Sequence, residues 1–173
     1  MENLLYSSCN PFEKNKKPLS EKRTSLPLVK AVSHSVKDGK PDTYVFTGDI
    51  DAMWLRDSSA QVYPNLHFVK DDKKPQQLVA GVINHQTRCM LKDPYANAFY
   101  NDPQKVGEWA KDDTDMRPGI HERKWEIDSL CYPIRLAYRY RKLTGDVTPF
   151  NDQWKSAITL MMTFPGIVHA TES

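Results

Sequence analysis

Residues 47–58 read TGDIDAMWLRDS and concentrate charged and aromatic side chains around the start of an expected helix. Arg56 and Asp57 are adjacent, so they can aim guanidinium donors and carboxylate acceptors into one pocket, which suits the vicinal hydroxyls of a sugar. Trp54 can offer an apolar face to a sugar ring, and Asp51 is a further acidic candidate. A structural interpretation stays open, in which Arg56 and Asp57 cap the helix and pair locally while Trp54 belongs to the core.

Four helices are predicted around this stretch because apolar residues recur at helical spacing. Their expected limits are Asp57 to His67 with a kink at Pro64, Pro75 to Asp93, Glu126 to Leu143, and Thr148 to Phe164. Asp57 or Ser58 is expected to cap the first helix. A strand or extended arm is expected over residues 43–47, where β-branched and aromatic residues follow one another. Residues 95–121 are expected to form a long loop, and such loops often line a site.

Two further stretches place polar residues next to expected helix ends. Tyr95 and Asn97 follow the second helix, where they are either hydrogen-bonding groups of a site or parts of a turn with an aromatic anchor. Glu126 and Asp128 lie at the start of the third helix. On a helix they would point about 200° apart, whereas in an extended chain they would share a face. Alternatively, they are acids that favour the dipole of the first turn.

The composition is that of a globular protein, with 173 residues of which 39% are hydrophobic and 27% charged. No apolar run approaches the ~18 to 20 residues of a bilayer span, and no secretory signal peptide is visible at this start. Residues 1–42 are expected to form a basic, loosely ordered leader, because residues 1–40 carry a net charge of +4. Residues 41–173 carry −2, which argues against a nucleic-acid partner.

The sequence predicts no metal and no cofactor. Cys9, Cys89 and Cys131 are far apart and form no CxxC pair, so neither a disulfide framework nor a zinc site is expected. Cys89 and Cys131 are expected to be buried thiols. The five histidines show no HExxH or HxH spacing. GxSxG, P-loop and GxGxxG motifs do not occur, so a hydrolytic triad or a nucleotide site has no support.

Three stretches, taken together and in order, resemble glycoside hydrolase family 125, the metal-independent exo-α-1,6-mannosidases. They are TGDIDAMWLRDS at residues 47–58, KDPYAN at residues 92–97 and ERKWEIDSLCYP at residues 122–133. The resemblance extends over about residues 44–162. It implies an all-α fold, namely a partial (α/α)6 barrel with about four helices of the toroid present and a short extended N-terminal arm.

The resemblance also implies an activity, which is inverting cleavage of a terminal α-1,6-linked mannose from a mannose-containing oligosaccharide. Inversion needs one carboxylic acid to protonate the leaving oxygen and one carboxylate to activate water, about 6.5–9.5 Å apart. Arg56 and Asp57 would hold hydroxyls of the terminal mannose. The other residues that would bind or shape the substrate are Trp54, Asp51, Tyr95, Asn97, Glu126 and Asp128.

The resemblance places both catalytic carboxyls outside this sequence. The acid of the family lies in a run resembling WSGFRPSDD and the base in a run resembling MHESF, and neither run occurs here. A barrel of twelve helices would also need more than about 350 residues. Residues 43–173 are therefore expected to be the N-terminal part of a truncated catalytic domain. Within the chain, Glu126 is the one weak candidate for a catalytic acid.

Two alternatives remain open at this stage. The helices could form a small, independent carbohydrate- or peptide-binding module without catalysis. Such a module would unfold cooperatively as a monomer, whereas part of a barrel would expose a wide apolar face and aggregate. A separately encoded remainder could also complement this chain, in which case co-expression of the two pieces would restore activity.

Overall fold

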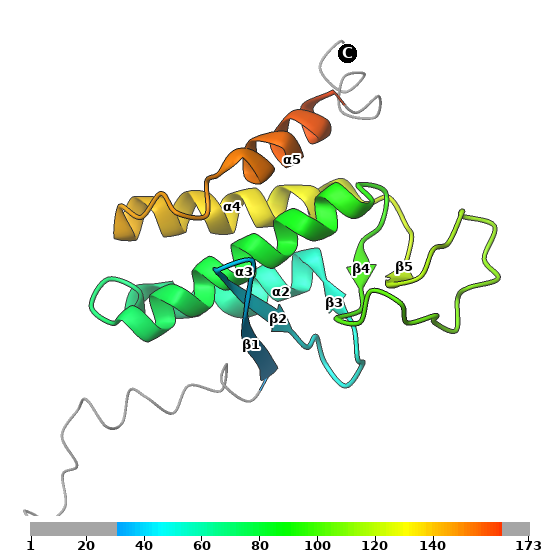
Figure 1. The fold of residues 1–173 in the computed structure, drawn as a ribbon, viewed down its shortest axis with the longest axis horizontal. Coiled ribbons are helices and arrows are strands. Elements are labelled where there is room, and N and C mark those ends of the chain that lie inside the picture. The colour runs from blue at the N-terminus through cyan, green and yellow to red at the C-terminus, as the bar shows by residue number, and fades with distance from the viewer. Residues whose placement is uncertain (1–30, 164–173) are drawn as a thin grey trace, which may run out of the picture. The chain divides into compact units, whose positions relative to one another are not determined.

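The computed structural model describes residues 31–163, so residues 1–30, the greater part of the expected leader, and residues 164–173 lie outside the described chain. A β-hairpin comes first, and helices and a small sheet follow (Figure 1). The elements in chain order are β1 (Val32–Lys37), β2 (Lys40–Val45), β3 (Met53–Trp54), α2 (Leu55–Val62), the 3-10 helix η2 (Tyr63–Phe68), α3 (Lys73–Lys92), β4 (Ala98–Phe99), β5 (Ile120–Glu122), α4 (Ile127–Thr144) and α5 (Asp152–Met162).

The hairpin of β1 and β2 packs against α3 through β2 (Figure 1). Asp38 and Gly39 form its turn, with positive φ angles of 52° and 71°. An Asp-Gly pair favours a two-residue hairpin turn because both of its residues tolerate positive φ. Tyr44 and Val45 on β2 are almost completely buried. The strand expected over residues 43–47 is therefore present, but as the second half of a hairpin whose first strand was not predicted.

The four predicted helices are present, with shifted starts and ends. α2 begins at Leu55 and has Trp54 as its N-cap, so the expectation that Asp57 or Ser58 caps this helix is wrong. Instead, the Ser58 hydroxyl donates a hydrogen bond of 3.2 Å to the carbonyl of Leu55. Pro64 lies in η2, so the chain changes to a 3-10 helix where a kink was expected. No helix within residues 31–163 is both long and apolar enough to cross a membrane.

Helix α4 follows its predicted course. It continues through Pro133 and ends at Gly145, whose φ of 72° is the left-handed conformation that favours glycine at a helix end. The expectation for the cysteines is half right, because Cys89 on α3 is buried but Cys131 on α4 is exposed.

The prediction of an all-α fold is wrong. Besides the hairpin, the described residues form a three-stranded antiparallel sheet in the order β3–β4–β5. Its strands are two or three residues long, too short for the alternation of polar and apolar residues that identifies a strand in a sequence. Residues 95–121 therefore resembled a single loop. A purely helical, partial (α/α)6 barrel with only an extended arm does not describe this chain.

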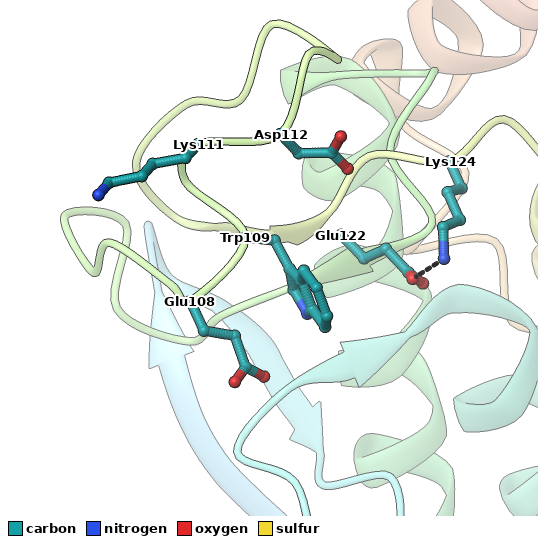
Figure 2. Close-up of a pocket in the computed structure, with 6 residues that line it drawn as sticks. All are labelled: Glu108, Trp109, Lys111, Asp112, Glu122 and Lys124. Atoms are coloured by element: carbon teal, nitrogen blue, oxygen red, sulfur yellow. Dashed lines mark hydrogen bonds and ion pairs between the residues drawn. The ribbon is translucent and has the colours of Figure 1, made fainter.

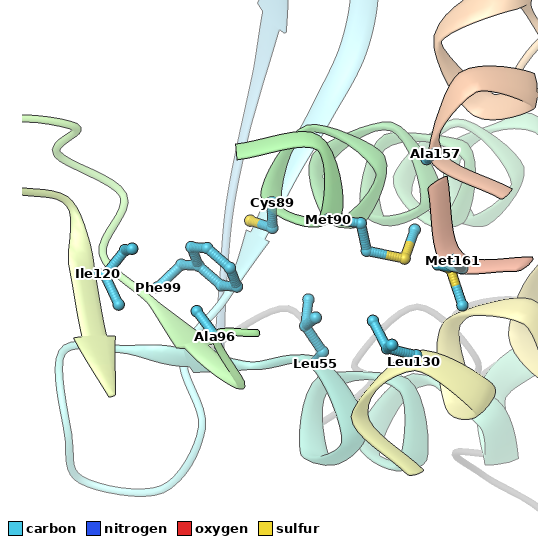
Figure 3. Close-up of a cluster of buried hydrophobic side chains, with 9 residues drawn as sticks. All are labelled: Leu55, Cys89, Met90, Ala96, Phe99, Ile120, Leu130, Ala157 and Met161. Carbon is cyan, nitrogen blue, oxygen red and sulfur yellow. The ribbon is translucent and has the colours of Figure 1, made fainter. Parts of the chain in front are cut away.

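One hydrophobic cluster joins the small sheet to the four helices (Figure 3). Its buried members are Leu55, Cys89, Met90, Ala96, Phe99, Ile120, Leu130, Ala157 and Met161. Two of them lie next to predicted site residues in the sequence, since Leu55 precedes Arg56 and Ala96 precedes Asn97. Burying a side chain the size of leucine stabilises a fold by about 1.5–3 kcal/mol. The same burial therefore fixes where the backbone presents Arg56 and Asn97.

A buried polar cluster pins the hairpin to α3. Asp42 on β2 is only 2% exposed, and its carboxylate contacts Arg88, the Nδ1 atom of His85 at 2.9 Å and Nζ of Lys37 at 2.9 Å. Burial alone would raise the pKa of Asp42, but the hydrogen bonds from His85, Arg88 and Lys37 hold it well below its ordinary value. Burial lowers the pKa of His85, and a carboxylate only accepts, so Nδ1 of His85 carries the proton and donates it.

We predict that Asp42→Ala lowers the free energy of unfolding by about 3 kcal/mol, because removing one partner of a buried charge pair leaves the other charges without compensation. Breaking a buried ion pair costs about 3–5 kcal/mol. We take the low end of this range because Arg88 and Lys37 are partly exposed. Urea unfolding of the 173-residue chain measures the change. The control is Ser35→Ala, the exposed partner of Asp42 across the hairpin, for which the change should stay within about 0.5 kcal/mol. Equal values for the two variants would contradict this role of Asp42.

Candidate functional site

A cavity of about 570 Å³ lies where α2 and α4 begin beside the small sheet. Its lining residues come from the turn before β3, the end of β3, the helix α2, the residue before β4, the end of β5 and the cap of α4. They are Thr47, Gly48, Trp54, Arg56, Asp57, Gln61, Asn97, Glu122 and Glu126. Five of the eight residues predicted from the sequence are thus brought together here. Those five are Trp54, Arg56, Asp57, Asn97 and Glu126.

Arg56 connects the starts of α2 and α4. Its Nη1 atom donates a hydrogen bond of 3.1 Å to Oδ2 of Asp128, and its Nε atom lies 3.5 Å from Oδ2 of Asp57. The hydrogen bond to Asp128 and the charge of Asp57 raise the pKa of Arg56. The side chains of Arg56 and Asp57 are 42% and 47% exposed, so both can still contact a ligand. A guanidinium has five N–H donors, and the two ion pairs leave some of them for hydroxyl oxygens.

Glu122 organises the part of the cavity that the small sheet forms. Its Oε2 atom accepts hydrogen bonds from the indole Nε1 of Trp54 at 3.2 Å and from Nδ2 of Asn97 at 2.7 Å. Its Oε1 atom accepts from Nζ of Lys124 at 2.6 Å. One carboxylate at the end of β5 thus holds side chains from β3, from the residue before β4 and from the segment after β5 in a single arrangement, and the orientation of the Trp54 ring depends on it.

The environment of Glu122 keeps it ionised. Partial burial alone would raise the pKa of Glu122, but the hydrogen bonds from Lys124, Asn97 and Trp54 outweigh it and hold the pKa below its ordinary value. A catalytic acid must carry a proton near neutral pH, so Glu122 is unsuited to that task. Its arrangement fits a residue that positions Trp54 and accepts hydrogen bonds.

Asn97 is buried and connects three segments of backbone. Its carbonyl accepts from the N–H of Leu55 at 3.0 Å, which fixes the first residue of α2. Its own N–H donates to the carbonyl of Glu122 at 3.2 Å, and its Oδ1 atom accepts from the N–H of Lys124 at 3.1 Å. Most of its polar groups therefore serve the framework of the cavity.

The turn before β3 is closed by Thr47. The Thr47 hydroxyl donates to the carbonyl of Ala52 at 2.9 Å and accepts from the N–H of Trp54 at 3.4 Å. Gly48 follows with a φ of 68°, a conformation that other residues adopt only under strain. This turn brings the backbone of residues 47 and 48 to the cavity edge beside Trp54.

Glu126 and Asp128 take different positions at the start of α4. Glu126 is the N-cap, has extended backbone angles and lines the cavity, and its Oε2 atom accepts from the Ser129 hydroxyl at 3.3 Å. Asp128 lies in the first helical turn and reaches Arg56 instead. The two acids therefore neither share a face nor point to one ligand atom, and Asp128 acts on the cavity through Arg56.

Asp51 and Tyr95 do not line the cavity. The carboxylate of Asp51 pairs with Nζ of Lys105 at 2.6 Å. The ring of Tyr95 lies 5.0 Å from the guanidinium of Arg123, and its backbone N–H donates to Asp93. A role of these two residues in substrate binding stays a prediction.

Four lining residues were not among the predicted candidates, namely Thr47, Gly48, Gln61 and Glu122. The spacing of α2 could have revealed Gln61, because it lies four residues after Asp57 and so on the same helical face. Glu122 gave no signal by spacing, although it opens the stretch ERKWEIDSLCYP, just as Thr47 and Gly48 open TGDIDAMWLRDS. Its place in the site depends on the pairing of β4 with β5, which brings it opposite Ala98.

A guanidinium–carboxylate pair beside an indole ring, in a cavity open enough to leave both charged groups half exposed, offers hydrogen-bond partners and an apolar face to one ligand. Within residues 31–163, no three His, Cys, Asp or Glu side chains gather closely enough to hold a metal ion.

Comparison with known proteins identifies the family of this chain. Residues 17–170 match the family described as metal-independent alpha-mannosidase (GH125), and the chain belongs to that family. It is 33% identical over 132 residues to the meiotically up-regulated gene 157 protein of Schizosaccharomyces pombe. It is also 42% identical, with a TM-score of 0.74, to a solved metal-independent alpha mannosidase of Streptococcus pneumoniae in a non-productive substrate complex with alpha-1,6-mannobiose.

The chain spans only part of these relatives. The match covers 72% of this chain and 26% of the yeast protein, and it covers 82% of this chain and 33% of the streptococcal structure. The family match over residues 17–170 confirms the family resemblance that the three sequence stretches indicated.

We predict that the hydrogen bond from Trp54 to Glu122 persists as the pH falls to 4.5, the ordinary pKa of a glutamate side chain, and is lost only below it. Because the folded pKa is lowered, the stabilising contribution of Glu122 is fully present above pH 4.5 and disappears as the pH falls through the folded value. We would measure tryptophan fluorescence against pH for the natural chain and for Glu122→Gln, which cannot ionise at this position. The difference between the two curves should change with pH, with a midpoint below pH 4.5.

The matched control is Asp71→Asn, which removes an exposed carboxylate from the turn before α3 and should leave the titration unchanged. A midpoint at or above pH 4.5 would show that the three donors do not hold Glu122 ionised.

Proposed function

We propose that this chain forms the sugar-binding part of a glycoside hydrolase that releases terminal α-1,6-linked mannose with inversion, and that the two catalytic carboxyls belong to a longer polypeptide. The observation that carries the proposal is the Arg56–Asp57 pair exposed in a cavity beside Trp54, in a chain of the metal-independent alpha-mannosidase family. The alpha-1,6-mannobiose bound to the streptococcal relative supports this substrate class. The chain matches only 26% and 33% of the length of these two relatives, which supports the proposal that the catalytic carboxyls lie outside it.

The chemistry of the pair suits a mannosyl ring. Each sugar hydroxyl both donates and accepts a hydrogen bond, so a guanidinium next to a carboxylate can satisfy two neighbouring hydroxyls at once. Asp128 fixes the Arg56 guanidinium before a ligand arrives, which reduces the entropy lost on binding. Trp54, held by Glu122, supplies apolar surface for the ring carbons.

The carboxyls of the cavity do not by themselves supply inversion. Glu122 is held ionised by three donors and is already engaged. Asp57 is paired with Arg56 and is the group that would accept sugar hydroxyls. Glu126 is the remaining lining carboxyl, and inversion requires a second one about 6.5–9.5 Å from the first to activate water. We infer that the chain holds and orients mannose, and that bond cleavage needs further residues.

We predict that Arg56→Gln weakens the binding of methyl α-D-mannopyranoside at least tenfold, because a hydrogen bond to a charged group contributes roughly 1.5–3 kcal/mol. Isothermal titration with the 173-residue chain measures the affinity. Stability should change little, since exposed ion pairs contribute about 0–1 kcal/mol.

The matched control for this variant is Arg139→Gln, which makes the same chemical change at an exposed position of α4 and should bind as the natural chain does. Equal binding by the two variants would refute a sugar-binding role for Arg56.

We also predict that the 173-residue chain binds α-1,6-mannobiose but releases no mannose from it. Chromatographic detection of free mannose after prolonged incubation tests this directly. Release of mannose that Glu126→Gln abolishes would show that the chain contains its own catalytic acid, and the proposed division between binding and catalysis would then be wrong.

A further inference from the structure

Strand β5 has one residue more than its pairing with β4 requires. Phe99 pairs with Ile120 and Ala98 pairs with Glu122, so two steps along β5 match one step along β4, and His121 is the extra residue. Such a β-bulge bends the strand and often re-aims a side chain next to a functional site. The bulge therefore makes His121 a residue whose direction a regular strand would not give.

Two neighbouring residues of β5 contact the same indole as a result. Nε1 of Trp54 donates to Oε2 of Glu122 at 3.2 Å, and Figure 2 shows this carboxylate with its ion pair to Lys124. The centre of the Trp54 ring also lies 4.9 Å from that of His121, with the two ring planes at 74°. This edge-to-face geometry is favoured between aromatic rings. In a regular strand, adjacent side chains point to opposite faces, so the bulge accounts for the double contact.

The His121 ring is itself fixed from behind by Tyr100. The tyrosine Oη atom lies 2.7 Å from Nδ1 of His121, and the two ring centres are 5.1 Å apart. Both side chains are buried. Burial raises the pKa of Tyr100 and lowers the pKa of His121, so the hydroxyl keeps its proton and donates it to a neutral imidazole. The hydrogen of His121 is then carried by Nε2.

The long loop after β4 holds Tyr100 in turn. Nζ of Lys105 lies 4.3 Å from the centre of the Tyr100 ring and pairs with the carboxylate of Asp51 at 2.6 Å. Gly107 lies so close that an added Cβ would be 2.4 Å from the tyrosine hydroxyl. Contacts therefore run without interruption from the loop through Tyr100 and His121 to the indole of Trp54.

We propose that His121 is a positioning residue, which orients the Trp54 indole toward the sugar ring, and that the Tyr100 hydroxyl holds the His121 ring in place for this task. This rests on the proposed function, since it takes Trp54 as the apolar surface for the sugar. The hydrogen bond to Glu122 fixes the indole at one atom only and leaves the ring free to tilt. The contact with His121 removes that freedom, so less entropy is lost when a sugar binds.

Two substitutions separate the ring of His121 from its hydrogen bond. His121→Asn can still accept from Tyr100 but has no ring, and His121→Phe has a ring but no acceptor. His121→Asn should weaken the binding of methyl α-D-mannopyranoside by about threefold to tenfold, the size of one aromatic pair, and His121→Phe should recover most of this loss. The matched control is His67→Asn, which makes the same change at an exposed histidine of η2 and should bind as the natural chain does.

The Tyr100 hydroxyl is tested in the same titration. Tyr100→Phe removes one oxygen and should weaken binding by about threefold, the lower end of that range. Tyr138→Phe, at an exposed tyrosine of α4, should leave the affinity unchanged. Tyr100→Phe is nearly isosteric, so it decides the matter if a variant at position 121 does not fold.

The indole N–H signal of Trp54 gives a readout without sugar. In the ¹⁵N-labelled 173-residue chain, His121→Asn and Tyr100→Phe should each move this signal, whereas that of Trp154 on α5 should stay in place. A Trp54 signal that does not respond, or equal losses of affinity in His121→Asn and His121→Phe, overturns the role of the His121 ring. If the natural chain does not bind the mannoside, the proposed function fails, whereas the Trp54 signal still reports whether His121 orients the indole.

Discussion

The position of Asn97 is the constraint on which the cavity depends. This buried residue fixes the first N–H of α2 through its carbonyl, and it ties β5 to β4 through its own N–H and its side-chain amide. Behind it, Ala96 belongs to the hydrophobic cluster that also holds Leu55. Arg56 and Glu122, which both line the cavity, are therefore positioned through the hydrogen bonds of one residue and through one core. A substitution that moved Asn97 would shift both lining residues together.

The electrostatic design of the site follows from this framework. Glu122 accepts three hydrogen bonds and stays ionised, whereas Arg56 is shared between Asp57 and Asp128 and keeps part of its surface in water. The Glu122 carboxylate is thus occupied by hydrogen bonds from within the protein, whereas the Arg56 guanidinium keeps donors that a ligand can reach. Under the proposed function, Glu122 is a positioning carboxylate and Arg56 with Asp57 is the pair that contacts the ligand. The proposal assigns to this cavity the holding of a neutral sugar, and to further residues its cleavage.

The sequence predicted those features that depend on local pattern. Apolar residues at helical spacing predicted four helices, Gly145 marked the end of α4, and three motif stretches predicted the family. Features that depend on distant pairing were missed. The short strands β3, β4 and β5 show no periodicity, and their pairing alone brings Glu122 beside Asn97 and Trp54. The hairpin could have been predicted, because Asp38-Gly39 is a favoured turn pair between two strands. The charged cluster around Asp42 depends on packing between β2 and α3, which no spacing in the sequence reveals.

The central claim is that the framework built on Asn97 shapes a pocket for a mannosyl ring. A crystal structure of the 173-residue chain grown with methyl α-D-mannopyranoside tests it most directly. We expect the ring in the cavity between α2 and β5, with hydroxyl oxygens within about 3.2 Å of the Arg56 guanidinium and the Asp57 carboxylate, which is the range of a hydrogen bond. A ring bound elsewhere, or Arg56 and Asp57 engaged only with protein groups while the cavity holds water, would contradict it.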